Sequence, residues 1–309
     1  MTVLAVDVGG TKLAAALVSA SGELTRAARR PTGDDPWASL SALLDELVAG
    51  VAVDGVGIGC GGPMRWPAGE VSPLNIPAWR GFPLRSRLAD RFPGVPVRLH
   101  NDAVCMAVGE HWRGDWGTED LLGMVVSTGV GGGLVLGGRL VHGGTGNAGH
   151  IGHLVVDPGG PSCGCGGRGC LEAVARGPAV VAWAAERGCA TTDAGQLAAL
   201  ARAGDRVAQQ AFSRAGWALG VGIASAAALL DVRVVVVGGG LSQAGEVLWG
   251  PLRAALAVHG RLGFLDGLRV EPAALGQDAG LIGAAALVLE GGRYWRERHL
   301  GGRAPDSAA

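Results

Sequence analysis

Apolar and polar positions follow two different patterns along the chain, and together they predict an α/β protein. Strands are expected where short runs are bounded by turn residues, at 3–8, 12–18, 23–29, 53–58, 95–99, 232–237 and 268–271. Helices are expected where apolar residues recur at helical spacing, at 35–48, 102–112, 178–187, 196–203, 207–230 and 279–289, with one more beginning near 243. The 279–289 helix should cross back to the first half of the chain, and a frayed, solvated tail should begin at Gly291.

Two segments about 120 residues apart share one pattern, at 6–24 and 126–140. Each reads as a strand, a short polar residue, a glycine loop, a strand, a glycine turn and a strand. This repeat predicts two lobes with the same β-strand beginning. We assign 1–106 with 282–309 to an N-terminal lobe and 107–281 to a C-terminal lobe. The alternative is two ordinary hairpins in a glycine-rich protein.

The composition narrows the class of protein. Glycine contributes 56 of 309 residues, yet no Gly-x-y period occurs and 48% of the chain is apolar, which excludes collagen and disorder. The net charge of −1 argues against binding nucleic acid. The chain opens without a signal-peptide pattern, and its longest apolar stretch, 215–230, is too short for a membrane span. We therefore expect a soluble, cytoplasmic protein without a membrane partner.

The first glycine loop, Asp7-x-Gly9-Gly10-Thr11-Lys12, follows a predicted strand. Without side chains in the way, its backbone N–H groups can approach phosphate oxygens, and its carboxylate can hold Mg²⁺. The spacing fits neither a Walker A loop nor a dinucleotide fingerprint, and taken alone the loop can equally be a hairpin turn. Its counterpart at 127–133 favours phosphate binding, because two facing loops can clamp a polyphosphate. Lys12 is the only lysine, either by genome bias or because a compact ammonium is required there.

Asn101 and Asp102 come directly after the 95–99 strand and open a helix. They can simply cap that helix. In a cleft between lobes, the Asp102 carboxylate is also placed to accept a proton from an attacking hydroxyl. The two roles are compatible.

A third pattern, His153-x9-Cys163-x-Cys165-x4-Cys170, supplies one nitrogen and three sulfurs, a complete tetrahedral set for Zn²⁺. Four protein ligands leave no open position, so the predicted metal is structural. The other cysteines, Cys60, Cys105 and Cys189, are expected to be ordinary core residues.

Over residues 3–290 these motifs resemble the ROK sugar kinases of the actin/hexokinase superfamily. They occur in family order as Asp7-x-Gly-Gly-Thr-Lys12, Gly62-Pro63, Asn101-Asp102, Ser127-Thr128-Gly129-x-Gly-Gly-Gly133, Gly149-x-x-Gly152-His153, Cys163-x-Cys-Gly-x-x-Gly-Cys170-Leu-Glu172 and Val237-Gly-Gly-Gly240. The resemblance implies an α/β, two-lobed actin/hexokinase-like (ribonuclease H-like) fold with a structural zinc loop. It also implies a homodimer.

The resemblance further implies roles for individual residues. Asp102 would be the general base for the sugar 6-hydroxyl. The sugar would be bound by Asn75, Asn101, Asp102, His153 and Glu172, with the other nitrogen of His153 on zinc. ATP and Mg²⁺ would be held by Asp7, Gly9, Gly10, Thr11, Lys12, Thr128, Gly129 and Gly131, with Gly238 and Gly239 behind the adenosine.

His150 departs from the glucokinases of the family, which carry Glu at this position and use it to contact the sugar. The Gly149-His150-Ile151-Gly152-His153 form resembles bacterial N-acetylmannosamine kinases. His150 therefore either contacts the sugar or only packs near the zinc loop. We expect an ATP-dependent 6-kinase for glucose, N-acetylmannosamine, N-acetylglucosamine or kanosamine. A sugar-responsive transcriptional regulator or a non-catalytic sugar sensor of the same family is the alternative. A regulator of this family would need a helix-turn-helix ahead of the strand at 3–8.

Overall fold

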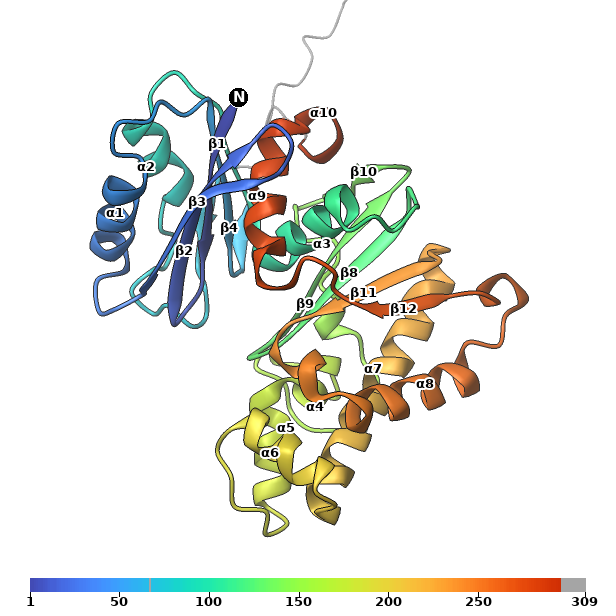
Figure 1. Cartoon of the computed structure of the whole chain (residues 1–309). Coiled ribbons are helices and arrows are strands. Elements are labelled where there is room, and N and C mark those ends of the chain that lie inside the picture. Colours follow the sequence, from blue (N-terminus) through green and yellow to red (C-terminus); the bar gives the residue numbers. More distant parts are fainter. Residues whose placement is uncertain (67, 296–309) are drawn as a thin grey trace, which may run out of the picture.

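Two five-stranded sheets form the framework of the structure, a computed structural model that describes residues 1–66 and 68–295 (Figure 1). The N-terminal sheet has the strand order β3-β2-β1-β4-β7. Its strands are β1 (Thr2–Val8), β2 (Lys12–Ser19), β3 (Leu24–Pro31), β4 (Gly55–Cys60) and β7 (Val97–Asn101). β1 to β3 are antiparallel, whereas β4 and β7 run parallel to β1. The carboxyl ends of β1, β4 and β7 therefore meet at one edge of the sheet.

The second sheet repeats this topology with the order β10-β9-β8-β11-β12. Its strands are β8 (Leu121–Val126), β9 (Val130–Leu136), β10 (Arg139–Leu140), β11 (Val234–Gly238) and β12 (Arg269–Pro272). Again an antiparallel meander is followed by two strands parallel to the first. The predicted two-lobed α/β fold is confirmed. The assignment of residues to lobes stays a prediction, and two helices run unbroken through the proposed boundaries at 106 and 282.

All the predicted helices are present, with small shifts of their ends. The helices are α1 (Pro36–Leu47), α2 (Leu84–Arg91), α3 (Asp102–Arg113), α4 (Leu171–Ala175), α5 (Gly177–Ala185), α6 (Ala194–Arg202), α7 (Arg206–Leu230), α8 (Glu246–His259), α9 (Ala279–Leu289) and α10 (Gly291–Tyr294). Three short helices, α2, α4 and α10, were not predicted, nor was the small hairpin of β5 (Met64–Arg65) and β6 (Glu70–Val71). The helix expected near residue 243 begins later, because Gly240–Ala244 forms a 3₁₀ turn first.

The predicted solvated tail is wrong for its first residues. Gly291–Tyr294 forms α10, the Tyr294 side chain is fully buried and Trp295 is 8% exposed. These aromatic rings add apolar surface to the core, which outweighs the glycines that begin the segment. The rest of the predicted tail, 296–309, lies outside the described residues.

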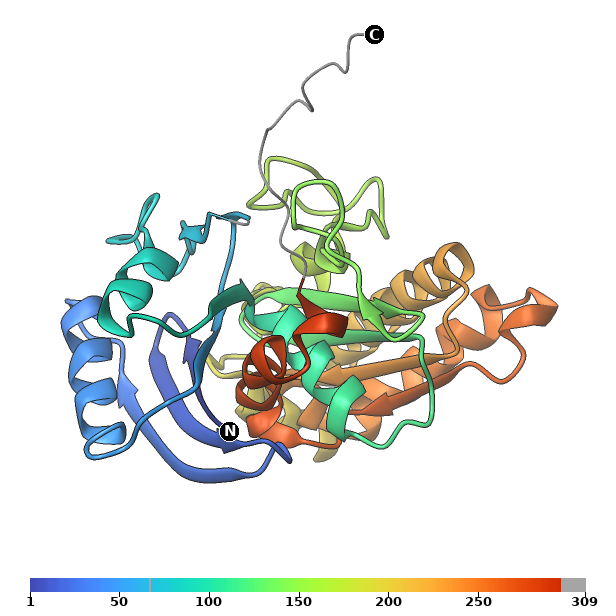
Figure 2. The same cartoon turned by 90° about the horizontal axis from the view of Figure 1, so that it is seen from above.

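α3 and α9 lie side by side between the two sheets (Figures 1 and 2). Glycine makes their contact possible. A Cβ on Gly283 of α9 would overlap the carbonyl of Cys105 in α3, and a Cβ on Gly57 of β4 would overlap the carbonyl of Ala284. The backbones of β4, α9 and α3 are therefore in direct contact, and α9 crosses back to the first sheet as predicted.

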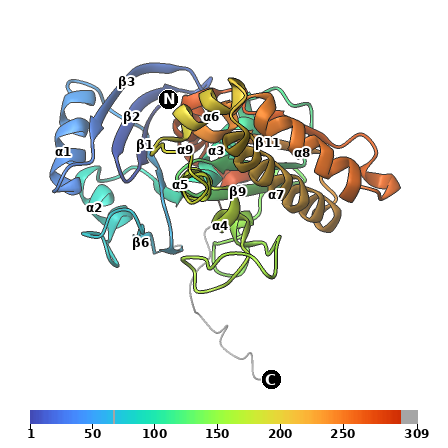
Figure 3. The same cartoon turned by 90° about the horizontal axis from the view of Figure 1, so that it is seen from below.

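α7 is long and apolar enough to cross a membrane by length and composition alone. In the structure it packs against α4, α5, α6 and α8, and residues such as Phe212, Leu219 and Ile223 are fully buried. It is therefore a core helix of the second lobe. On one side of the molecule, the loops leading to α4 and the β5–β6 hairpin both project from the sheets (Figure 3).

Candidate active site

Several predicted residues meet where the parallel strands of the first sheet end. Asp7 pairs in register with Gly59 of β4, and Cys60 pairs with Asn101 of β7. A Cβ placed on Gly61 would lie 3.9 Å from Asn75 Oδ1 and 3.9 Å from Asp102 Oδ2. The Asn75 and Asp102 side chains thus face the same space beside Gly61. Asn75 also touches the first glycine loop, because its side chain lies where a Cβ of Gly10 would be.

Asp102 is the first residue of α3. The backbone N–H of Ala103 donates to both Asn101 Oδ1, at 3.0 Å, and Asp102 Oδ1, at 2.8 Å. The predicted capping role is confirmed, and it leaves Asp102 Oδ2 directed at the space beside Gly61. Burial raises the pKa of Asp102, while the Ala103 N–H and the nearby charge of His150 act in the opposite direction. A carboxylate with a raised pKa is a better proton acceptor.

Asp7 lies at the end of β1, and its pKa is raised from 3.8 to about 7. Burial is the main cause, followed by the negative charge of Asp102, while Lys12 and Arg29 partly offset the effect. Its Cγ lies 3.9 Å from the Cβ position of Gly280, at the start of α9. Two buried carboxylates, Asp7 and Asp102, therefore share one site, an arrangement that a bound cation would stabilise.

The first glycine loop is held as a tight turn. The Gly9 N–H donates to the Lys12 carbonyl at 3.0 Å, and the buried Thr32 hydroxyl donates to the Gly9 carbonyl at 2.7 Å. Thr11 and Lys12 are exposed and thus accessible to a ligand. Thr32 was not predicted, because a threonine just after a strand carries no signal of its long-range partner.

The second glycine loop is fixed by Glu172. The Val130 N–H donates to Glu172 Oε2 at 2.9 Å, and the Ser127 carbonyl accepts from the Gly177 N–H at 2.7 Å. The structure thus places the predicted sugar ligand Glu172 beside Gly129 and the exposed Thr128.

The other glycines predicted to bind nucleotide lie near this second loop. Gly239 follows β11 and packs directly on the backbone of Val126, the last residue before the loop. Gly131 packs against Ala103 at the start of α3, where a Cβ would lie 2.8 Å from the alanine methyl group. Gly238 lies close to Met106 of the same helix. The second loop, the end of β11 and the Asp102 helix are therefore adjacent.

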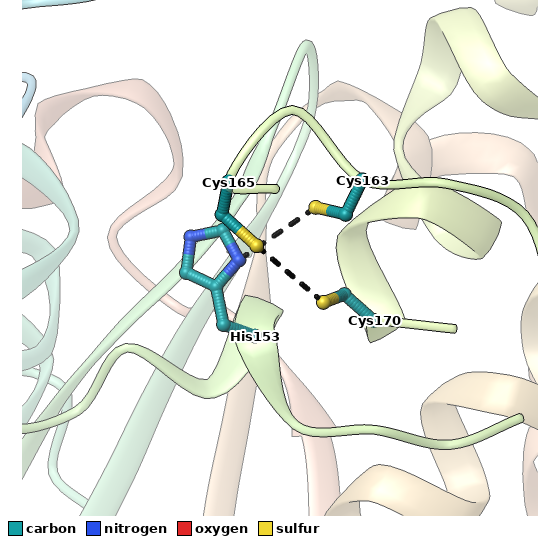
Figure 4. Close-up of side chains that lie close together, drawn as sticks. All are labelled: His153, Cys163, Cys165 and Cys170. Atoms are coloured by element: carbon teal, nitrogen blue, oxygen red, sulfur yellow. Dashed lines mark hydrogen bonds between the residues drawn. The ribbon is translucent and has the colours of Figure 1, made fainter. Parts of the chain in front are cut away.

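The four predicted metal ligands converge (Figure 4). The ligand atoms of His153, Cys163, Cys165 and Cys170 all lie within 4.8 Å of one another. A tetrahedral zinc site with Zn–S bonds of about 2.3 Å needs sulfur atoms about 3.8 Å apart. The Cys165–Cys170 Sγ separation is 3.7 Å, and Cys163 Sγ lies 3.8 Å from His153 Nδ1. The donor set therefore suits a tetrahedral zinc ion, with Nδ1 of His153 as the nitrogen ligand.

His150 lies three residues before His153, and the two rings stack with centroids 6.2 Å apart. His150 Nδ1 lies 2.9 Å from the Asn147 carbonyl, which can only accept, so Nδ1 carries a proton. In the neutral ring Nε2 is then the acceptor. The charge of His150 acts on Asp102, so the zinc-loop side of the site faces the predicted base.

A cavity of about 200 Å³ adjoins the first glycine loop. It is lined by Gly10, Thr32, Gly33, Asp34, Pro36, Asn75, Ile76, Pro77 and Ala78. The remaining cysteines, Cys60, Cys105 and Cys189, are buried as predicted, and burial raises the pKa of each thiol.

Comparison with known proteins decides the family. The model of the ROK family matches residues 3–291. The chain belongs to the ROK family. The chain is 35% identical to a glucokinase of Thermotoga maritima, covering 94% of this chain and 98% of the relative. It is 39% identical to an N-acetylmannosamine kinase of Shigella flexneri, covering 93% and 98%.

A solved structure supports the ROK fold. The crystal structure of a ROK family glucokinase from Streptomyces griseus, in complex with glucose and AMPPNP, has a TM-score of 0.81 and 32% identity to this chain. The match covers 94% of this chain and all of that one. The predicted family and the actin-like two-lobed fold are therefore confirmed. The predicted roles of individual residues of this ROK protein stay predictions.

We predict that each chain of this ROK protein binds about one zinc ion. Metal analysis by mass spectrometry measures this stoichiometry. C163S removes one of four ligands and should lower the zinc content several-fold. C189S is the matched control, because Cys189 is also buried but lies outside the cluster, and it should keep the metal. Freshly purified, unchelated protein without zinc would contradict the ligand assignment.

We predict that D7N stabilises the folded protein at the expense of its function. Because the folded-state pKa of Asp7 is raised from 3.8 to about 7, the stability that depends on Asp7 is complete below pH 3.8 and is lost as the pH rises through 7. The amide of the D7N variant does not ionise, so this pH-dependent loss of stability does not occur in it. The free energy of unfolding of D7N should exceed that of wild type by more than about 1 kcal/mol at pH 8 and equal it near pH 4.

Urea denaturation at pH 4, 6 and 8 measures this difference. D266N serves as the control, since Asp266 is exposed, and it should show no advantage that grows with pH. A D7N protein less stable than wild type at pH 8 would refute the assigned burial cost.

Proposed function

We propose that this protein transfers the γ-phosphoryl group of ATP to the 6-hydroxyl of a hexose or amino-hexose. The enzyme class follows from the family. Relatives named glucokinase and N-acetylmannosamine kinase align over nearly the whole chain, so this protein is a sugar kinase. One observation supports the detailed proposal most directly. Asp102 Oδ2 lies beside Gly61 and Asn75, Asn75 touches the first glycine loop, and Gly131 of the second loop packs on Ala103, the residue after Asp102.

In this proposal Asp102 accepts the proton of the sugar 6-hydroxyl as the oxygen attacks the γ-phosphorus. The bond from the γ-phosphorus to the bridging oxygen breaks, and ADP leaves. Asn75, Asn101, His153 and Glu172 hold the sugar hydroxyls, so that the 6-hydroxyl meets Asp102. The Ala103 N–H fixes the Asp102 carboxylate through Oδ1, which leaves Oδ2 to act on the substrate.

The phosphates of ATP lie between the two glycine loops in this proposal. Thr32 holds the first loop and Glu172 the second, so backbone N–H groups and the hydroxyls of Thr11 and Thr128 face the ligand. Lys12 contributes a positive charge, and Gly238 and Gly239 leave room for the adenosine. Mg²⁺ would neutralise charge on the phosphates, and the buried Asp7 carboxylate fits the hard oxygen ligand that this ion prefers.

In this proposal, zinc would have a structural role and hold the side chains of the site in place. With Nδ1 of His153 on the metal, Nε2 is left for the sugar, and the metal fixes both the orientation and the tautomer of the ring. Glu172 follows the last zinc ligand by two residues, so the same loop positions a sugar contact and the second glycine loop.

The six cysteines, all described and free of disulfides, suit a reducing compartment such as the cytoplasm.

His150 bears on the choice of sugar. Its Nε2 is an acceptor in the neutral ring and a donor after protonation, whereas a carboxylate only accepts. Glucose, N-acetylmannosamine, N-acetylglucosamine and kanosamine are the candidates, and N-acetylmannosamine is favoured by the His150 sequence pattern. The homodimer stays a prediction.

We predict that D102N lowers kcat by about 10²–10⁴-fold, the usual contribution of a general base. The amide keeps an oxygen for the Ala103 N–H, so folding and sugar binding should persist. A coupled ADP-release assay measures turnover, and calorimetry measures sugar binding. D205N is a control, since the Asp205 carboxylate also accepts a backbone N–H at a helix start but is not among the predicted site residues, and its kcat should equal that of wild type.

Near-normal turnover of D102N would refute the base assignment. Wild type that binds sugar but releases no ADP would instead support a sugar sensor.

We predict that H150E raises kcat/KM for glucose relative to N-acetylmannosamine about tenfold, which corresponds to about 1.4 kcal/mol, close to one charged hydrogen bond. The acceptor-only carboxylate favours sugars that present hydroxyl donors at this position. The assay compares the four candidate sugars. H259E, at an exposed histidine at the end of α8, is the control and should leave the ranking unchanged. An unchanged ranking for H150E would show that His150 does not set specificity.

A further inference from the structure

Two buried histidines that no motif includes meet at the junction of the lobes. His100 is the residue of β7 that precedes Asn101, and His142 follows β10 of the other sheet. Their side chains are hydrogen-bonded, with His100 Nε2 3.2 Å from His142 Nδ1. His100 is 1% exposed and His142 is 8% exposed. A hydrogen bond enclosed in this way is protected from competing water.

The direction of this hydrogen bond follows from a second one. The backbone N–H of Asn101 donates to His100 Nδ1 at 2.9 Å, so Nδ1 is an acceptor and the ring proton is on Nε2. His100 therefore donates to His142 Nδ1. Burial, followed by the nearby His142 and His150, lowers the pKa of His100 to about 3, which keeps the ring neutral and this donor pattern intact.

Aromatic rings enclose the pair. Trp66, next to the β5–β6 hairpin, stacks on His142 with centroids 4.6 Å apart and planes inclined by 21°. Trp295 meets His142 edge-on at 6.4 Å. Trp66 also packs on Gly146, so the hairpin holds the loop that follows His142. The charge of His150 acts on His100, and the guanidinium groups of Arg85 and Arg98 lie over the Trp295 ring.

Each histidine also fixes a segment that leads to the active site. On one side, His100 Nδ1 accepts a hydrogen bond from the Asn101 N–H, where β7 ends and the helix that begins with Asp102 follows. On the other side, the His142 carbonyl accepts from the Ala148 N–H at 3.2 Å and closes the loop at 142–148. The next residues are Gly149 and His150. The pair thus joins the backbone that carries the predicted base to the backbone that carries the predicted sugar contacts.

We propose that the His100–His142 hydrogen bond is a positioning link that sets the distance between Asp102 and the sugar-binding segment at 149–153. The proposal rests on the function proposed above. Neither histidine touches the reacting atoms, and each acts through the backbone that it holds. The link works on sugar placement and on the attack geometry.

Two substitutions at His142 separate the hydrogen bond from the packing. H142N keeps an acceptor at the δ position but loses the ring, whereas H142F keeps a ring on Trp66 but loses the acceptor. We expect H142F to lower kcat roughly 10- to 100-fold and raise the KM for sugar, because small misplacements of reacting groups are costly. Its KM for ATP should match wild type. H142N should recover most of the lost activity.

The controls keep the test decisive. Melting curves show whether each variant folds, and H142L is the second acceptor-free variant should H142F not fold. An H142F protein with wild-type kcat and sugar KM would overturn the proposal, as would H142N falling as far as H142F, since packing would then explain the effect. A general loss of active protein, with both KM values unchanged, would also overturn it.

A further measurement does not depend on turnover. In ¹⁵N-histidine NMR of the wild type at pH 7, we expect His100 to be neutral and protonated at Nε2, with a slowly exchanging Nε2 proton that H142F exposes to faster exchange. A charged His100, or one protonated at Nδ1, would refute the link. Wild type inactive on every sugar would refute the proposed function, and the NMR result would still decide whether the hydrogen bond exists.

Discussion

The direct backbone contact between α3 and α9 is the constraint on which the rest of the structure depends. α3 begins with Asp102 and packs against β8 and β9, whereas α9 packs against β1, β4 and β7. Because glycine allows the two helices to touch, the two sheets, and with them the two glycine loops, are held in one relative position. A Cβ at Gly283 would push α3 and α9 apart and shift one sheet relative to the other.

The electrostatics of the site follow from the strand order of the first sheet, which brings the ends of β1 and β7 close together. Burial raises the pKa of both Asp7 and Asp102, and the negative charge of Asp102 raises the pKa of Asp7 further. The folded chain is thus less stable at neutral pH than it would be without Asp7. Such a cost is typical of a functional site whose negative charges are balanced when a cation is bound.

Local features of the site could be predicted from the sequence, because their chemistry lies within a few residues. The zinc ligands Cys163, Cys165 and Cys170 span one loop, and each glycine loop follows its own strand. Contacts between distant segments could not be predicted. Thr32 on Gly9, Glu172 on Val130 and His100 on His142 depend on strand order, which periodicity does not report. The helix α2 was missed because its charged sequence has only Leu84 and Leu88 on the buried face.

Lys12 has a practical consequence. It is the only lysine of the chain, it is exposed, and it is the first residue of β2, directly after the first glycine loop. Amine-directed reagents therefore find a single side-chain target. Acylation of that amine would remove the positive charge that lowers the pKa of Asp7. The protein thus carries its own site-specific attachment point, so that a reporter group can be introduced at the first glycine loop without engineering the sequence.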